Sequence, residues 1–357
     1  MSDGDRILGV CTALAARLGM PSDALHPLPD KGLAHDHVRL CDSGTLARVP
    51  KQSQLGLAAA ENLAYQAACF ARAAESGHAP RLHYTLAPGD GLPMGALIVE
   101  AIDGRPLSLP DDLQAMAECL ASIHALPLPP GDVRAPLKDP PDLLGDTFTE
   151  VLGQAGYIAG AELHPDAEAQ IREELRSAGT TLARAARPPR SLIAFDAHPG
   201  NYLVRPDGRV ILVDLEKARY GAAGFDLAHA SLYTSTTWDV NSHAVLGPGQ
   251  VADFYRVWLD AVPAELAAAT EPWLWPLRRI MWLWSVTWCA KWRVKSRQAT
   301  ETGGEKNGST DNWSAKLSDD ALIRHVAGRV ADYLDPETIA HIRADWQPSA
   351  AATARTG

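Results

Sequence analysis

The chain has 357 residues, with 33 basic and 43 acidic side chains, a formal net charge of −10 and 46% apolar residues. It exceeds the roughly 250 to 300 residues at which one hydrophobic core stops growing, so two lobes are expected. The acidic balance argues against general nucleic-acid binding, and the scattered cysteines, without a CxxC pair, argue against a disulfide framework or a thiolate metal site.

Nothing in the sequence approaches the roughly 18 consecutive apolar residues of a membrane span. The N-terminus MSDGDRILGV also lacks the basic and apolar regions of a signal peptide. We therefore expect a cytoplasmic protein without a membrane span.

The first hundred residues alternate helical and extended patterns. Apolar residues at helical spacing predict a helix over 5–18, and the string HVRLCDSGTLARVPK predicts a hairpin. An Ala- and Leu-rich stretch that stops at Gly77 predicts a second helix, and GALIVEAI predicts a buried strand. The order helix, hairpin, helix, strand predicts a small α+β lobe.

After Gly104 the pattern becomes mainly helical. Helices are predicted over 113–126 and 168–186, separated by a proline-rich irregular segment, and again from Asp226 onward. The runs SLIAF, NYLVRP and RVILVDL form the clearly β-patterned part of this half. The polar run 300–312 is expected to be mobile and the tail 348–357 to be disordered.

The string LIAFDAHPGNYLVRPDGRVILVDLEKARYGAAGFDLAHAS carries the chemistry. Asp196 and Asn201 lie five apart on a loop, and Asp214 ends the following hairpin. Phosphoryl transfer needs one carboxylate for the proton of the attacking hydroxyl, and oxygen ligands that hold Mg²⁺ against the nucleotide phosphates. Each residue alone is more typical of a turn than of such a site. Together, with a carboxylate on an apolar strand, they favour a phosphoryl-transfer site.

The motifs DAHPGNYLV, VILVDLE and GFDLA resemble those of the aminoglycoside phosphotransferase and choline kinase-like family, whose fold is that of the protein kinases. The resemblance implies an α+β, bilobal protein kinase-like fold, with a small N-lobe of antiparallel sheet and one main helix and a larger, mostly helical C-lobe. The N-terminal nucleotide-binding lobe and hinge would cover 1–102, and the C-terminal catalytic and substrate-binding lobe 103–347. ATP and Mg²⁺ are the implied cofactors.

The resemblance also assigns roles to single residues. Asp196 matches the catalytic aspartate, and the metal ligands and supporting residues that match are Asn201, Asp214, His198, Glu216 and Asp226. Glu216 stands where many members carry another acid near a second metal ion. Asp226 matches the aspartate that braces the catalytic loop from the next helix.

The N-terminal half matches the nucleotide-binding parts of the family. In LARVPK, Arg48 is the expected cation for the phosphates, with Lys51 as competitor, and Glu61 in the following helix is its expected partner. The alternative for this pair is a surface ion pair worth about 0 to 1 kcal/mol. GALIVEAIDGRPL matches the hinge, where backbone groups near Glu100 and Ile102 would bind adenine.

Two departures from the family leave a second function open. Ala194 and Phe195 replace its leading histidine and glycine, and KGLAHDHVRL offers Gly32 and two histidines where a glycine-rich turn would cover the phosphates. A catalytically impaired, kinase-like nucleotide-binding or scaffold protein is therefore the alternative to a small-molecule kinase.

The motifs do not identify the acceptor hydroxyl. The resemblance implies aminoglycosides, amino alcohols such as choline, or sugars. The negative net charge suits a cationic acceptor, with Asp239 and Glu265 as candidate amine partners.

Six of the ten tryptophans fall between Trp273 and Trp292, in a stretch that carries six bases and no acid between Glu271 and Glu301. Trp284 and Trp288 share a helical spacing with Trp292 and predict an aromatic helix face. Three interpretations stay open: a core helix of the second lobe, a substrate wall or cage for a quaternary ammonium, and a basic helix on a membrane or partner surface.

Overall fold

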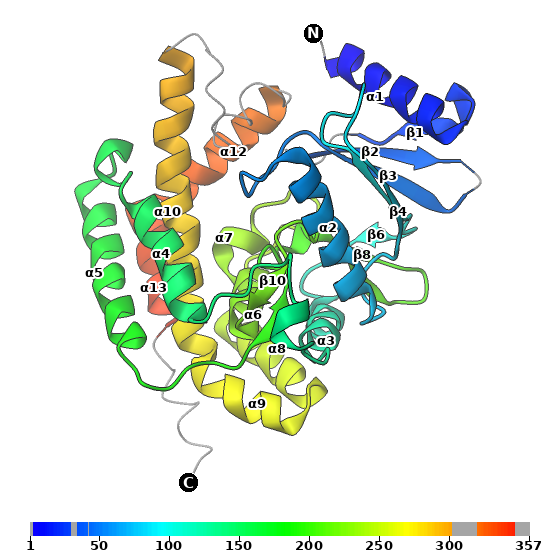
Figure 1. Cartoon of the computed structure of the whole chain (residues 1–357). Helices are drawn as coiled ribbons and strands as arrows, with labels where there is room; N and C mark the ends of the chain where they lie inside the picture. The colour runs from blue at the N-terminus through cyan, green and yellow to red at the C-terminus, as the bar shows by residue number, and fades with distance from the viewer. Residues whose placement is uncertain (1–2, 30–33, 42, 302–319, 347–357) are drawn as a thin grey trace.

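The structure, a computed structural model, describes residues 3–29, 34–41, 43–301 and 320–346. Its N-terminal part is built on an antiparallel sheet with the strand order β1-β2-β3-β5-β4 (Figure 1). The strands of this sheet and the helices packed on it are β1 (Leu25–Pro27), β2 (His35–Leu40), β3 (Thr45–Pro50), β4 (Leu82–Leu86), β5 (Ala96–Glu100), α1 (Asp3–Leu18) and α2 (Ala59–Ala74).

Helices α1 and α2 pack on opposite faces of this sheet, because successive side chains of a strand point to opposite sides. In β5, Ile98 packs in one cluster with Leu14 of α1. Its neighbour Leu97 packs in another cluster with Phe70 of α2. All four side chains are fully buried, so the apolar run of β5 fills both faces of the sheet.

The predicted hairpin is confirmed. β2 and β3 pair antiparallel with His37 opposite Arg48, and the turn passes through Gly44, whose φ of +63° lies in the left-handed region that side chains disfavour. Directly opposite residues project to the same face of a sheet. The hairpin therefore presents His37 and Arg48 together.

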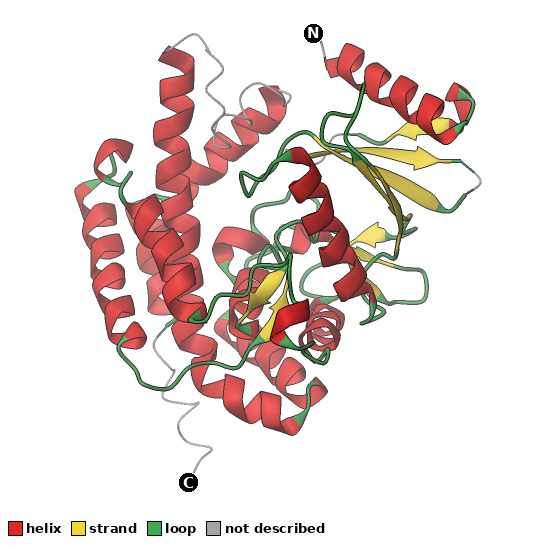
Figure 2. Cartoon of the chain, viewed as in Figure 1, coloured by secondary structure: helices red, strands yellow, loops and turns green. Residues whose placement is uncertain are grey.

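The rest of the chain is mostly helical and surrounds the long helix α10 (Figure 2). Short strands form a β6-β8-β9 sheet and a β7-β10 pair, and carry loops between them. These elements are α3 (Leu113–His124), α4 (Leu143–Ala155), α5 (Pro165–Leu182), α6 (Ala223–Ser231), α7 (Tyr233–Thr236), α8 (Pro248–Ala261), α9 (Ala264–Thr270), α10 (Leu274–Glu301), α12 (Asp320–Tyr333), α13 (Pro336–Ala344), β6 (Arg105–Pro106), β7 (Ser191–Ile193), β8 (Tyr202–Val204), β9 (Val210–Leu212) and β10 (Arg219–Gly221).

Helix α10 packs against α4, α5, α6 and α12. On its inner face Leu277 and Trp282 are fully buried, and the Trp282 ring meets that of Trp346 at 5.0 Å. The interpretation of this segment as a core helix is therefore right for that face, whereas Trp284 and Trp288 are only half-buried on another. Among the described residues, no helix combines the length and apolar character needed to cross a membrane.

Most elements expected from the sequence are present. The α+β class, the order helix, hairpin, helix, strand, and the β-patterned stretch after residue 190 are confirmed. The strands β1, β4, β6 and β10 and the helix α4 were not expected. The lobe boundary at residue 102 stays a prediction, and Gly32, nearly all of the run 300–312 and the tail 348–357 lie outside the described residues.

Candidate active site

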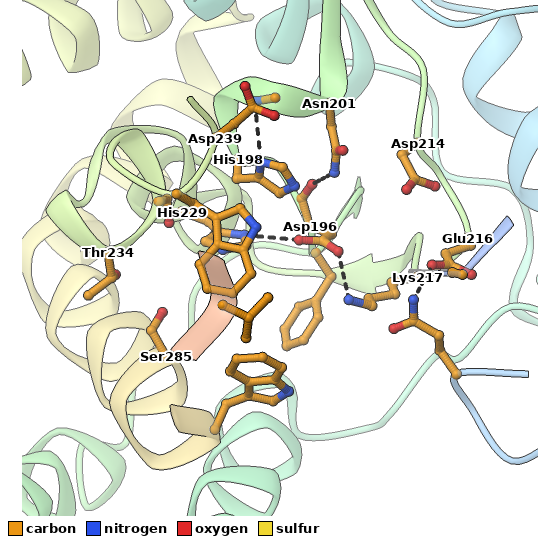
Figure 3. A pocket seen from close by; sticks show the side chains of 18 of the residues that line it. Asp196, His198, Asn201, Asp214, Glu216, Lys217, His229, Thr234, Asp239 and Ser285 are labelled. Carbon is orange, nitrogen blue, oxygen red and sulfur yellow. Dashed lines mark hydrogen bonds and ion pairs between the residues drawn. The ribbon is translucent and has the colours of Figure 1, made fainter. Parts of the chain in front are cut away.

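A cavity of about 840 Å³ lies between the β2-β3 hairpin and the helices α6, α7 and α10, with the loop between β7 and β8 in its wall (Figure 3). The predicted site residues that line it are Arg48, Asp196, His198, Asn201, Asp214, Glu216, Asp239, Trp284 and Trp288. Residues from both halves of the chain thus share one cavity.

The loop between β7 and β8 is held by Asp226, in the first turn of α6. Its two carboxylate oxygens accept the backbone N–H groups of Ala194 and Phe195 at 2.7 and 2.8 Å. Asp226 is fully buried and also lies 3.1 Å from Nε2 of His124. Trp258 Nε1 can only donate and lies 3.1 Å from the Nδ1 of His124, so Nδ1 accepts this bond and Nε2 donates to Asp226. An imidazole from α3 therefore supports the loop through Asp226, although Ala194 stands where the family has a histidine.

The carboxylate of Asp196 faces the cavity among basic side chains (Figure 3). Lys217 Nζ donates to its Oδ2 at 2.6 Å, and His229 Nδ1 lies 3.8 Å from Oδ1. Burial alone would raise the pKa of Asp196, but Lys217, His198 and His229 hold it below its usual range. Burial lowers the pKa of His229 to about 4, although Asp196 opposes that shift. Asp196 is thus an anion paired with one ammonium group.

Asn201 and Asp214 lie on two segments that a backbone hydrogen bond joins. Asn201 Nδ2 donates to the carbonyl oxygen of Asp196 at 2.8 Å, which leaves its own amide oxygen for another partner. The N–H of Val213 donates to the carbonyl of Asn201 at 2.8 Å. This bond holds the segment of Asp214 against the loop, so both candidate metal ligands line the same cavity.

Arg48 extends from β3 to Asp214. Its Nη2 donates to Asp214 Oδ1 at 2.8 Å, and its Nη1 to the carbonyl of Val213 at 3.2 Å. Burial alone would raise the pKa of Asp214, but Arg48 lowers it below its ordinary value. His35 and His37 lie 3.4 and 3.3 Å from the guanidinium and also line the cavity. Burial and then the Arg48 charge lower the pKa of His35 to about 3, so it is a neutral neighbour of Arg48.

Glu216 is a buried carboxylate beside Asp214. Gln54 donates to its Oε1, whereas its Oε2 is buried without a hydrogen-bond partner. Burial and the negative charge of Asp214 raise the pKa of Glu216 to about 8. A cation bound beside Asp214 and Glu216 would lower the pKa of Glu216 again, because its positive charge favours the ionised carboxylate.

The expected ion pair between Arg48 and Glu61 is wrong. Glu61 is exposed and accepts the backbone N–H of Ala58 at 3.3 Å, which caps the start of α2. Lys51 is the alternative cation, and its Nζ forms an ion pair with Asp36 Oδ1 at 3.7 Å. The N-terminus of α2 offers Glu61 a backbone donor nearby, so the Glu61 side chain caps this helix and does not pair with Arg48.

The hinge residues Glu100 and Ile102 are not among the residues that line the cavity. The Glu100 N–H donates to the carbonyl of Arg81 at 2.8 Å, and its carboxylate accepts from Arg205 at 2.6 Å. Burial would raise the pKa of Glu100, but Arg205 lowers it. The assignment of this segment to adenine stays a prediction.

The acceptor candidates separate in the structure. Asp239 lines the cavity, and its Oδ1 accepts the backbone N–H of Asn241 at 2.7 Å. Trp284 also lines it, and its Nε1 donates to Glu150 at 3.2 Å. Glu265 is exposed in the first turn of α9 and is not among the lining residues, so the cavity gives it no role.

Lys217 and Glu150 are among the residues of the site that were not singled out from the sequence. Lys217 follows Asp214 by three positions, and only the path of the chain shows that it reaches Asp196. Glu150 of α4 accepts from Lys138 and Arg219 as well as from a tryptophan of α10. The apolar spacing of α4 could have indicated the helix, but nothing local to Glu150 indicates its partners.

Phe195 adopts a φ of +61°, in the region that costs a side-chain-bearing residue about 1 to 2 kcal/mol. Its fully buried ring lies 3.7 Å below the Arg219 guanidinium and 5.5 Å from the Trp284 ring. We expect Phe195→Gly to be more stable than Phe195→Ala by about 1 kcal/mol, because both variants lose the ring and only Gly loses the strain. Urea unfolding of the two variants measures the difference.

The control for this prediction is Ala228, which is also fully buried but lies in the middle of α6, where the backbone is helical. There a change to Gly should cost about 0.5 to 1 kcal/mol. Equal or lower stability of Phe195→Gly relative to Phe195→Ala would show that the left-handed conformation carries no strain.

Comparisons with known proteins identify a family and a fold. The family model described as the phosphotransferase enzyme family matches residues 30–269. No curated protein matches the chain. Similar solved structures include a choline/ethanolamine kinase family protein from Mesorhizobium loti, 18% identical, which covers 96% of this chain and 100% of that one with a TM-score of 0.57.

Two further structures show the same fold. A choline kinase from Cryptosporidium parvum is 12% identical, with 96% of this chain and 97% of that chain covered and a TM-score of 0.58. The GDP complex of aminoglycoside 2'-phosphotransferase-IIIa is 14% identical, with 91% and 98% covered and a TM-score of 0.60. The expected kinase-like fold is confirmed.

Proposed function

Because the chain belongs to the phosphotransferase enzyme family, we propose that it transfers the γ-phosphate of ATP, with Mg²⁺, to a hydroxyl group of a small molecule. The family and the choline, ethanolamine and aminoglycoside kinases among its structural neighbours support a small-molecule phosphotransferase. The observation that carries the proposal is the shared cavity of Asp196, Asn201 and Asp214, with Arg48 paired to Asp214.

In the proposed reaction the acceptor hydroxyl attacks the γ-phosphorus in line, the new P–O bond forms, and the bond to the β-phosphate oxygen breaks. Asp196 orients the hydroxyl and accepts its proton. Its lowered pKa makes it a weak base, so positioning contributes more than early proton removal. Lys217 keeps this carboxylate charged and places a positive charge beside the reacting groups.

The donor set fits Mg²⁺, which prefers carboxylate and amide oxygens. Asp214 and the free amide oxygen of Asn201 would hold it, and Glu216 offers a buried oxygen without a partner. When bound, Mg²⁺ would neutralise charge on the phosphate oxygens. Within the described ranges, no three His, Cys, Asp or Glu side chains could hold a metal by themselves, so Asn201 and the phosphates would share its coordination.

Arg48 is proposed to bind the nucleotide phosphates. It lines the cavity and contacts Asp214 and the neutral His35 and His37, so Asp214 is the charged one of these three neighbours. A guanidinium offers several N–H donors in a fixed plane, which suits phosphate oxygens. Adenine would then lie toward the hinge at 100–102, as the sequence predicts.

The alternative, a catalytically impaired scaffold protein, rested on the departures at Ala194 and Phe195 and on the glycine-poor turn at Gly32, which lies outside the described residues. Ala194 and Phe195 both donate their backbone N–H groups to Asp226, so the loop that carries Asp196 is fixed through main-chain bonds. These bonds do not depend on the side chains that differ from the family. They support the catalytic proposal over the scaffold one.

We expect Asp214→Ala to remove the Mg²⁺-dependent part of ATP affinity, about 10- to 100-fold, because a charged oxygen ligand is lost. Affinity for ATP without metal should stay the same or rise, since Arg48 loses the carboxylate that now occupies it. Calorimetric titration with ATP, with and without Mg²⁺, measures both terms. Asp207→Ala, in an exposed turn, is the matched control, and an unchanged Mg²⁺ dependence in Asp214→Ala would contradict the metal site.

The proposed function is tested by ATP consumption with a panel of acceptors that includes aminoglycosides, amino alcohols, sugars and aromatic alcohols. Acceptor-dependent ADP release, with the phosphorylated acceptor identified by mass spectrometry, is the expected result. A chain that does not bind ATP in the presence of Mg²⁺ would sink both the kinase and the scaffold alternatives.

A further inference from the structure

The side of the cavity formed by α10 and its neighbours is lined with aromatic side chains. We call it the aromatic wall, and its members that line the cavity are Phe195, Trp238, Trp284, Trp288 and Trp292. Their rings meet edge to face, with centroids 5.5 Å apart for Phe195 and Trp284 and 5.8 Å apart for Trp238 and Trp288. Such a surface favours an apolar or aromatic ligand body.

The aromatic wall begins at the reacting carboxylate. Phe195 directly precedes Asp196 in the chain. His229, whose Nδ1 lies 3.8 Å from Asp196 Oδ1, has its ring 6.3 Å from that of Trp284. A molecule with its hydroxyl at Asp196 would therefore lay its body along the tryptophans of α10.

The charges on this side do not suit a polycation. Helix α10 contributes Lys291 and Lys295 to the cavity lining. Of the carboxylates there, Glu150 already accepts from Lys138, Arg219 and Trp284, and Asp239 accepts a backbone N–H. A polycation would bring several ammonium groups out of water, and of these two carboxylates only Asp239, without an ion pair among the described residues, could meet them.

A quaternary ammonium would gain attraction from the tryptophan faces. It would, however, be brought toward the ammonium groups of Lys291 and Lys295, which line the same side. An anionic or neutral body takes the aromatic contact without that repulsion.

Polar groups of the ligand also have partners in the wall of the cavity. The hydroxyls of Thr234 and Ser235 line it and are at least nine-tenths buried, and neither has a hydrogen-bond partner. A buried hydroxyl without a partner costs free energy, so a ligand carbonyl or hydroxyl placed there would be favoured.

We propose that the acceptor is a hydroxyl compound with a bulky apolar or aromatic body that is neutral or anionic, and not an aminoglycoside or choline. The inference rests on the proposed function for its hydroxyl at Asp196. The ligand class itself follows from the aromatic wall, the two lysines and the two unpartnered hydroxyls.

The test is calorimetric titration of the full chain, without nucleotide, with naphthyl ethanol, hydroxymethyl naphthoate, choline and kanamycin. The two naphthyl compounds should bind at least about tenfold more tightly than choline or kanamycin. Trp288→Ala should weaken the naphthyl compounds about tenfold, the loss expected for one aromatic contact. Trp275→Ala is the matched control, because Trp275 lies on the same helix, is 38% exposed and is not among the lining residues.

Charge reversal gives a second readout. Lys295→Glu should weaken hydroxymethyl naphthoate several-fold and leave naphthyl ethanol unchanged. Tighter binding of kanamycin or choline than of the naphthyl compounds, or an unchanged affinity in Trp288→Ala, would overturn the inference. A chain that binds Mg·ATP but prefers kanamycin would overturn the ligand class alone, whereas one that binds naphthyl ethanol but no Mg·ATP would overturn the proposed function.

Discussion

Replacing Asp196 by Asn is expected to lower kcat by about 100- to 10,000-fold, the range that a positioned general base contributes. The amide cannot accept the proton of the acceptor hydroxyl, and its NH₂ group would face Lys217, which now donates to Oδ2 at 2.6 Å. The affinity for Mg·ATP should change by only a few-fold, because Arg48, Asn201 and Asp214 are unaltered. Steady-state kinetics with the identified acceptor and calorimetry with Mg·ATP separate the two effects.

The matched control is Asp253→Asn, because Asp253 is a 74% exposed carboxylate on α8 that pairs with Arg256. It should keep the parent kcat. Urea unfolding of Asp196→Asn establishes that the variant is folded. Full turnover by a folded Asp196→Asn protein would refute the assignment of this residue.

The site was predictable where its residues are close in the chain. Asp196 and Asn201 lie on one loop, and Asp214 ends the next hairpin. A backbone hydrogen bond between Val213 and Asn201 is therefore enough to bring these three side chains to one cavity. Strand, loop and hairpin are local structures, and their residue types are set by turn and strand chemistry. Local sequence patterns were therefore enough to predict that Asp196, Asn201 and Asp214 belong to one candidate site.

Partners that are distant in the chain were not predictable. Arg48 was expected to pair with Glu61, thirteen positions away, but it pairs with Asp214 across the cavity. Glu61 has a local alternative at the start of its own helix, and local hydrogen bonds compete well with distant ones. The link of Lys217 to Asp196 likewise depends on the direction of the chain after β9.

The missed elements have weak local signals. The helix α4 is capped by Asp142, whose side chain accepts the N–H of Leu144, but its sequence includes Gly145 and Gly153 and follows a proline-rich segment. Strand β4 lies at the edge of its sheet and is mostly exposed, so it lacks the apolar pattern of β5. Tertiary contacts, and not propensity, decide both.

The tryptophan-rich helix shows why periodicity alone was ambiguous. Trp282 is buried in the core, so the core interpretation is right for that face of α10, whereas Trp284 and Trp288 line the cavity and their role as a substrate wall stays a prediction. A helix with aromatic residues on several sides has no single apolar direction. The helices that pack against α10 determine which tryptophans are buried in the core and which line the cavity.

Replacing Asp226 by Ala is expected to destabilise the fold by about 3 to 5 kcal/mol. Its carboxylate is fully buried and accepts the N–H groups of Ala194 and Phe195 and the Nε2–H of His124. Without it three donors would be left unsatisfied in the interior, each at a cost of about 1 to 3 kcal/mol, partly offset by relaxation. Urea unfolding measures the loss as a lower midpoint at constant slope.

Asp335→Ala is the matched control, because it separates burial from the number of hydrogen bonds. Asp335 also accepts two backbone N–H groups, from Glu337 and Thr338, both at 3.0 Å, but it is exposed at the start of α13. Its loss should cost about 1 kcal/mol, because water replaces the carboxylate. The turnover of the folded Asp226→Ala protein should also fall, since Asp196 directly follows the released amides. Equal destabilisation by the two variants would show that Asp226 acts as an ordinary cap and does not hold the catalytic loop.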